Sequence, residues 1–375
     1  MNDSDLPTPA HEIIPHSPFP IPHSFFIPHF RRWVVAWILL TSWLTRPVLA
    51  ETPDDRLDPD DPMPPNVESP TFGGWQLWGD ELVFHGWRIQ RHVSTGHYRL
   101  LDELNLRHAW GTFEQCRAKL EEIKAAKHLA PMQGRVVLLM HGMLRTRSSM
   151  HKLAKTLDDT GGYEAVPVSY PSTREGVGYN ARALASIIAG LGPEVTEIDM
   201  VGHSLGNLVI RHYYGDTLHQ PGGPGPDTRI RRIVMLGPPN HPPQRARLWA
   251  DHSTFRGLYY FALPGTGHQL AEGFTELEPK LATPTCEFGI LAGGKGDGKG
   301  WHPTLPGDDD TTVTVDETRL AGARDFAVLP VMHTFLMSDP KTIECTLRFL
   351  ENGYFFGEAL RQPIPGMPER RGNGE

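Results

Sequence analysis

Short apolar segments alternate with helix-like segments along most of the chain. The apolar segments show little polar alternation, which is typical of strands covered on both faces of a parallel sheet. They are RVVLLM at 135–140, EAVPVSY at 164–170, EIDMV at 197–201, RIVML at 232–236, FGILA at 288–292 and FAVLPV at 326–331. The helical segments between them include SSMHKLAKTLDD, NARALASIIAGL and LGNLVIRHYYGDTL. This alternation predicts an α/β fold with a doubly wound, mostly parallel sheet.

The region before residue 135 has a different pattern. Residues 51–70 are rich in Pro and Asp and predict a linker, and a single domain is expected over 71–375. The segment WQLWGDELVFHGWRIQRHV at 75–93 alternates well enough to predict one or two strands. The segment FEQCRAKLEEIKAAKHL at 113–129 is rich in strong helix formers and has apolar residues at helical spacing, so it predicts a helix.

One segment between predicted strands, residues 238–287, is longer than an ordinary connection. It predicts a cap over one end of the sheet. The segment contains a group of aromatic residues, Phe255, Tyr259, Tyr260 and Phe261. Two interpretations of this group stay open: the rings pack within the cap, or they line a pocket for substrate.

Residues 1–50 have the pattern of an export signal. Two arginines at 31–32 precede the apolar run WVVAWILLTSWL at 33–44, and Val48 and Ala50 stand at the −3 and −1 positions of a cleavage site. The alternative is an uncleaved membrane anchor, although the run is shorter than the roughly 20 residues that span a bilayer. We expect an exported protein that is periplasmic, secreted or bound to the cell envelope.

Charge and cysteine usage exclude some classes of function. The formal net charge is −8, and no block rich in Lys and Arg offers a basic surface, so nucleic acid is not expected as a partner. The three cysteines, Cys116, Cys286 and Cys345, belong to no CxxC or Cys/His cluster. They predict three buried thiols, with one disulfide as the alternative, and no metal site is predicted.

The motif GHSLG at 202–206 joins the predicted strand EIDMV to the helix that follows it. Flanking glycines allow a tight turn that projects Ser204 at the carboxyl end of the strand. A serine nucleophile needs a base, a group that orients the base, and donors for the oxyanion. Because RVVLLM leads directly to Gly142, we expect the backbone N–H groups of Met143 and Leu205 to face the oxyanion. The alternative is a plain strand-to-helix turn.

The order of these motifs resembles the α/β-hydrolase family, and in particular its small bacterial triacylglycerol lipases and esterases. The resemblance covers 135–353: a strand and HGM, a strand and GHSLG, a strand and LGPPN, then an acid and a histidine. It implies the α/β-hydrolase fold with a cap insertion and a triad in the order Ser, Asp, His. After LGPPN the family often has small residues, whereas this chain has HPP at 241–243. The departure leaves the rim of the site, and with it the substrate, open.

The resemblance places the base at His333, which follows the last predicted strand; an ordinary loop histidine is the alternative. The family's acid opens the pattern Asp-x-x-Val, followed by a short helix, a turn and the last strand. The segment DTTV at 310–313 begins this pattern, and TVDETRL would supply the helix, so Asp310 is implied as the acid. Asp308 and Asp309 are expected to be solvated acids before a helix N-terminus. A calcium site is a weaker interpretation because the aspartates lack the spacing of a calcium loop.

The glycine-rich segment GGKGDGKG at 293–300 nearly matches a phosphate-binding loop. Gly300 stands where that motif needs a hydroxyl for magnesium, and the next residues do not start a helix convincingly. We expect a flexible loop before the acid instead.

Together these residues predict a serine hydrolase that cleaves carboxylic esters of small molecules or lipids through Ser204, His333 and Asp310. No cofactor is expected, and association with a membrane surface stays open. The same triad supports thioester or amide cleavage and acyl transfer to other acceptors. A non-catalytic envelope protein that retains the fold is a further alternative.

Overall fold

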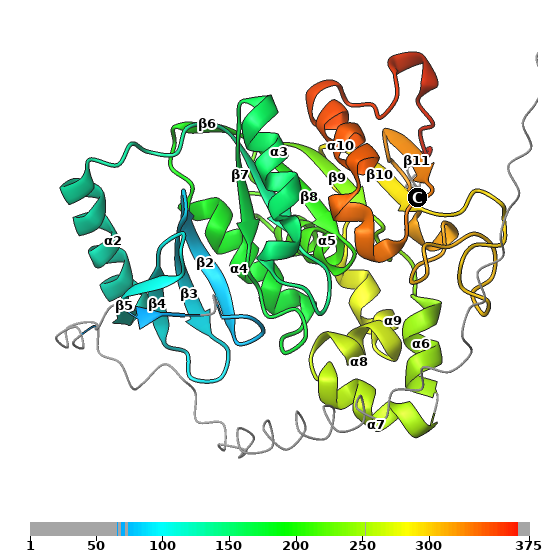
Figure 1. Ribbon diagram of the computed structural model, residues 1–375, viewed down its shortest axis with the longest axis horizontal. Coiled ribbons are helices and arrows are strands. Elements are labelled where there is room, and N and C mark those ends of the chain that lie inside the picture. Colours follow the sequence, from blue (N-terminus) through cyan, green and yellow to red (C-terminus); the bar gives the residue numbers. More distant parts are fainter. Residues whose placement is uncertain (1–65, 67–68, 72–73, 252, 367–375) are drawn as a thin grey trace, which may run out of the picture. The chain divides into compact units, whose positions relative to one another are not determined.

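The computed structural model describes residues 66, 69–71, 74–251 and 253–366. The predicted export signal and nearly all of the predicted linker lie outside this part of the chain. Within it, helices surround two separate β-sheets (Figure 1). None of the helices among the described residues combines the length and the apolar character needed to cross a membrane.

The first sheet is antiparallel and has the strand order β1-β5-β4-β3-β2. Its strands are β1 (Ser69–Pro70), β2 (Trp78–Phe84), β3 (Trp87–His92), β4 (Tyr98–Leu101) and β5 (Leu106–Gly111), and the predicted helix α2 (Phe113–Lys127) follows them. The prediction of one or two strands over residues 75–93 is confirmed by β2 and β3, whereas β1, β4 and β5 were not predicted. β4 and β5 are short and carry charged side chains such as Arg99 and Arg107, so their conformation depends on pairing with neighbouring strands rather than on a local pattern.

The second sheet has six strands in the order β11-β10-β9-β8-β6-β7, and every neighbouring pair is parallel. Its strands are β6 (Gly134–Met140), β7 (Tyr163–Val168), β8 (Val195–His203), β9 (Ile230–Leu236), β10 (Glu287–Gly293) and β11 (Asp325–Leu329). Each strand coincides with a predicted apolar run, and the doubly wound α/β fold is confirmed. The strand order reverses at β6, so the carboxyl ends of β6 and β8 flank the crevice where such sheets bind ligands.

Both faces of the parallel sheet are covered, as alternate side chains of β6 show. Val136 and Leu138 belong to the core shared with α4 and α5, whereas Val137 and Leu139 belong to the core shared with α3 and α10. The covering helices are α3 (His151–Gly161), α4 (Val177–Gly190), α5 (Leu205–Leu218) and α10 (Pro340–Asn352). Short 3₁₀ turns are η2 (Arg147–Met150), η4 (Asp316–Thr318), η5 (His333–Ser338) and η6 (Glu358–Leu360).

The segment predicted as a cap contains short helices that cluster together (Figure 1). They are α6 (Gln244–Asp251), α7 (Ser253–Ala262), α8 (Thr266–Ala271), α9 (Phe274–Leu277) and the turn η3 (Glu278–Lys280). Tyr260 stacks on His268 with the ring centroids 3.8 Å apart, whereas Phe261 is exposed. The side chains of Phe255 and Tyr259 lie outside the described part of the structure.

All three cysteines are free thiols, so the alternative of a disulfide is wrong. Cys116 and Cys345 are buried, as predicted, whereas Cys286 is partly exposed and accepts a hydrogen bond from the Tyr214 hydroxyl at 3.2 Å.

Candidate active site

Ser204 occupies the turn between β8 and α5. Its φ of 51° and ψ of −119° are costly for a residue that carries a side chain. Neighbouring glycines make the turn possible: a Cβ at position 202 would lie 2.2 Å from Asn207 Oδ1, and one at position 206 would lie 2.5 Å from the carbonyl oxygen of Met140. The turn therefore holds Ser204, partly exposed, at the carboxyl end of β8.

The turn after β6 lies against Ser204. β6 and β8 are neighbours, with Met140 opposite Gly202, and a Cβ on Gly142 would lie 3.3 Å from Ser204 Cβ. Leu205 is the first residue of α5, where a backbone N–H has no helical acceptor. Neither this N–H nor that of Met143 donates a hydrogen bond to any residue that the structure describes. Both donors therefore remain available to a ligand beside Ser204.

Asp310 and His333 form a buried pair. His333 Nδ1 and Asp310 Oδ2 are 2.6 Å apart, and the Asp310 side chain is fully buried. Asp310 Oδ1 accepts hydrogen bonds from the backbone N–H groups of Thr312 at 2.9 Å and Val313 at 2.8 Å. An ionised carboxylate accepts hydrogen bonds, so Nδ1 of the ring donates the proton. This arrangement leaves His333 Nε2 unprotonated in the neutral ring and able to act as a base.

His203, the residue before Ser204, links the Asp310–His333 pair to the β8–α5 turn. His203 Nε2 donates to the His333 carbonyl oxygen at 3.0 Å, and the two rings are 4.8 Å apart at their centroids. Burial, and then the neighbouring His333 ring, lowers the pKa of His203 well below its usual range, so His203 is neutral. Ser204 makes no hydrogen bond to His333 in the described structure, and such contacts are often long without substrate.

The two other aspartates bind backbone groups of the loop, and the expectation of a solvated acid is wrong for Asp309. Asp309 is fully buried and accepts hydrogen bonds from the backbone N–H groups of His302 at 3.1 Å and Thr311 at 2.6 Å. Asp308 is partly exposed and accepts from the backbone N–H groups of Lys295 at 2.6 Å and Gly296 at 2.7 Å. Both carboxylates therefore hold loop backbone donors, which accounts for their positions without a calcium ion.

These contacts also account for the glycine-rich segment. The amides of Lys295 and Gly296, which would have to surround a phosphate, are bound by Asp308. Among the described residues, no group of three or more His, Cys, Asp and Glu side chains could hold a metal ion. Where the sequence predicted a helix over TVDETRL, the structure has only the short turn η4. Thr314 and Glu317 bond reciprocally at its start, with the Thr314 N–H on Glu317 Oε2 at 2.8 Å.

Gln76, which the sequence pattern did not single out, links three loops. Its Nε2 donates to the carbonyl oxygen of Arg145 at 2.9 Å, in the turn after β6. Its Oε1 accepts from the backbone N–H of Thr173 at 2.9 Å and from the hydroxyl groups of Thr173 at 3.0 Å and Ser172 at 3.2 Å, after β7. Thr266 of α8 adds a hydrogen bond of 2.7 Å to the Ser172 carbonyl oxygen. No local motif marks this glutamine because its partners are distant in sequence.

A family model described as "Alpha/beta hydrolase family" matches residues 136–345. The chain belongs to the alpha/beta hydrolase family. The match begins in β6 and ends in α10, so it includes the turns that hold Ser204, Asp310 and His333. Family membership supports hydrolase activity. The antiparallel sheet lies before the matched residues and is not part of the match. No curated protein matches the chain.

Solved structures with similar folds are distant. A Listeria innocua gene product shares 20% identity with a TM-score of 0.39, over 59% of this chain and 95% of its own. A Bacillus licheniformis lipase in mature form shares 20% identity with a TM-score of 0.38, over 60% of this chain and 92% of its own. A Legionella pneumophila phospholipase shares 17% identity with a TM-score of 0.41, over 58% of this chain and 60% of its own. The family assignment rests on the family model and the sheet topology rather than on these likenesses.

Proposed function

We propose that the protein is a serine hydrolase that cleaves carboxylic esters. Ser204 is the nucleophile, His333 the general base, and Asp310 the residue that orients the imidazole. The observation that carries this proposal is the buried Asp310–His333 pair, which fixes the ring with its Nδ1 on the carboxylate and lies beside the strained turn of Ser204.

In the proposed reaction, Ser204 Oγ attacks the ester carbonyl carbon while His333 Nε2 takes the hydroxyl proton. The Met143 and Leu205 amides donate to the oxyanion of the tetrahedral intermediate. His333 then returns the proton to the leaving alcohol, and an acyl group stays on Ser204. Water, deprotonated by the same ring, attacks the acyl-enzyme and releases the carboxylic acid. Asp310 stabilises the imidazolium at each proton transfer.

Exposed apolar side chains next to the site favour esters with an apolar acyl group. Leu144 follows Met143 and is 60% exposed, and Met332 and Phe335 flank His333 with 39% and 51% exposure. A hydrogen bond from the Arg145 guanidinium to the Thr334 hydroxyl joins the two segments that carry them. Apolar residues that stay exposed beside a site often bind ligand or a surface. We propose small-molecule or lipid esters as substrates. The proposal extends to contact with a membrane surface and to export of the protein.

The test of the nucleophile is covalent labelling with a fluorophosphonate probe. We expect rapid labelling of the wild type and none of Ser204→Ala, whereas Ser94→Ala, a change at an exposed position, keeps wild-type labelling. Equal absence of label from wild type and Ser204→Ala overturns the proposal and favours a non-catalytic protein with this fold.

The class of substrate needs a separate test with purified protein. A panel of nitrophenyl esters of short and long acyl chains, with a thioester and an amide beside them, compares kcat/KM for each bond type. Preference for longer chains supports the apolar acyl site. Activity confined to short chains contradicts the lipid part of the proposal, and faster thioester or amide cleavage contradicts the ester part.

A further inference from the structure

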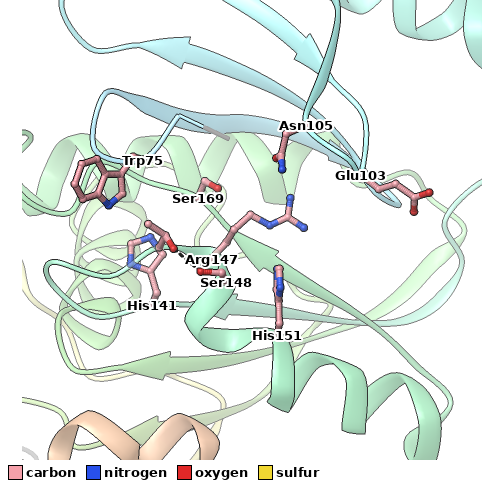
Figure 2. Close-up of a pocket in the computed structure, with 9 residues that line it drawn as sticks. Trp75, Glu103, Asn105, His141, Arg147, Ser148, His151 and Ser169 are labelled. Atoms are coloured by element: carbon pink, nitrogen blue, oxygen red, sulfur yellow. Dashed lines mark hydrogen bonds between the residues drawn. The ribbon is translucent and has the colours of Figure 1, made fainter. Parts of the chain in front are cut away.

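A cavity of about 150 Å³ is lined in part by residues next to the turn that follows β6 (Figure 2). Its wall includes Asn105 from the antiparallel sheet region and His141, Arg147, Ser148, His151 and Ser169 from the loops of the parallel sheet. None of these residues belongs to the proposed triad. The cavity thus has polar walls and a positively charged group, Arg147, among them.

The Arg147 guanidinium has no partner among the residues that the structure describes: it makes no hydrogen bond or ion pair with them, and its Nε is buried. A buried acid, Asp80, attracts Arg147 electrostatically, but its carboxylate accepts hydrogen bonds from Gln90 Nε2 and the Ser169 N–H, both at 2.7 Å. The exposed carboxylate of Glu103 points away from the guanidinium (Figure 2). An unpaired, largely buried guanidinium is costly and calls for an acceptor.

Asn105 offers a second donor to the same space. Its Oδ1 accepts from Arg88 Nη2 at 2.7 Å, so its Nδ2 is the end turned toward Arg147 (Figure 2). Arg88 is fully buried and its Nε and Nη1 have no partner in the described structure, which adds positive charge behind Asn105. Two donor groups, the guanidinium and the amide, therefore face each other, and neither donates to a residue in the described part of the chain.

His141 also lines the cavity, where its ring stacks on that of Tyr170. Its Nδ1 donates to the Gly142 carbonyl oxygen at 2.8 Å, and burial lowers the pKa of the ring to about 4, so Nε2 is unprotonated at neutral pH. A ligand that fits Arg147 and Asn105 has at least two negatively charged or polar oxygens. Phosphate in its monohydrogen or dihydrogen form has such oxygens. A short carboxylate has two of them.

We propose that this cavity binds a small oxyanion, phosphate or a short carboxylate, through the Arg147 guanidinium and the Asn105 amide. The volume of the cavity, about 150 Å³, suits a small ion. His141 precedes Gly142 and Met143, and Arg147 follows them, so the same short stretch of chain contacts the cavity on one side and Ser204 on the other. The site is independent of the proposed function, because binding there involves none of the triad residues.

The experiment is calorimetric titration of the full chain with inorganic phosphate and, separately, with acetate, against chloride at equal ionic strength. We expect saturable binding of one oxyanion per chain. Arg147→Gln should weaken the Kd at least tenfold, because it removes a charge-assisted contact. Arg117→Gln, which removes an exposed positive charge from α2, should leave the Kd unchanged.

Arg147→Lys serves if the Gln variant fails to fold, as judged by circular dichroism. It keeps the charge but loses the planar fork, so its Kd should rise several-fold. Tighter phosphate than acetate binding identifies an inorganic oxyanion, and the reverse identifies a carboxylate. The proposal is overturned if neither anion binds beyond chloride, or if the folded Arg147 variants bind as tightly as the wild type.

Discussion

Asp310 and His333 are joined through both their side chains and their main chains. The ring Nδ1 lies 2.6 Å from Asp310 Oδ2, and the His333 backbone N–H donates to the Asp310 carbonyl oxygen at 2.8 Å. The second bond fixes the start of η5 against the acid loop, so the imidazole does not depend on the carboxylate alone for its place. Removal of the carboxylate charge should therefore change the chemistry more than the fold.

Asp310→Asn tests this separation. The amide cannot stabilise the imidazolium and favours the wrong ring tautomer, so we expect kcat for ester hydrolysis to fall about 10³–10⁴-fold. The melting temperature should change little, because the main-chain bond to His333 remains. Steady-state kinetics and thermal denaturation on the same preparation measure the two effects.

Asp308→Asn is the matched control, with the same chemical change two residues away. Asp308 holds the amides of Lys295 and Gly296, so the variant should lose about 1–2 kcal/mol of unfolding free energy while kcat stays within a few-fold of wild type. If Asp308→Asn abolishes turnover and Asp310→Asn does not, the acid has been assigned to the wrong aspartate.

The buried carboxyl group of Asp80 should make the unfolding free energy depend on pH. Its carboxyl is fully buried, and burial raises its pKa from 3.8 to about 6. Between these values the folded protein binds a proton that the unfolded chain releases, so this group makes the unfolding free energy fall as pH rises toward 6. The shift corresponds to about 3 kcal/mol at most.

Urea denaturation of wild type and Asp80→Asn from pH 4 to pH 7 measures this effect. The difference in unfolding free energy, wild type minus variant, should decrease up to about pH 6 and then level off. A difference that stays constant across this range contradicts a raised pKa of Asp80.

The sequence predicted the parts of the molecule that depend on local pattern. The strands of the parallel sheet are continuous apolar runs, and Ser204 stands in a turn whose glycines are visible in the sequence. In the antiparallel sheet, β2 and β3 lie in the segment predicted to form strands, whereas β4 and β5 were missed because they are held by cross-strand pairing. The burial of Asp309 was missed because its partners include His302, across a loop with no regular periodicity.

A substitution of Gln76 tests whether this residue, which the sequence pattern did not single out, positions the turn that carries Met143. Gln76→Leu removes the bond to the Arg145 carbonyl oxygen, so the turn that carries Met143 loses an anchor. We expect kcat to fall roughly tenfold with KM nearly unchanged, because oxyanion donors act in the transition state. Gln220→Leu, at an exposed position, is the control. A variant of Gln76 that melts earlier but keeps full kcat shows that the glutamine only stabilises the fold.

Gly206→Ala tests the packing that permits the Ser204 turn. The added Cβ would lie 2.5 Å from the Met140 carbonyl oxygen and 2.8 Å from Met140 Cβ, both in the strand β6 beneath the turn. Backbone in the middle of a sheet cannot shift freely, so the variant should lose about 1–3 kcal/mol of unfolding free energy. The displaced turn should also slow fluorophosphonate labelling of Ser204. Gly257→Ala makes the same change in α7, where a Cβ meets no atom within 4 Å, and should be neutral or slightly stabilising. Equal stability and equal labelling rates for the two alanine variants contradict the close approach of α5 to β6.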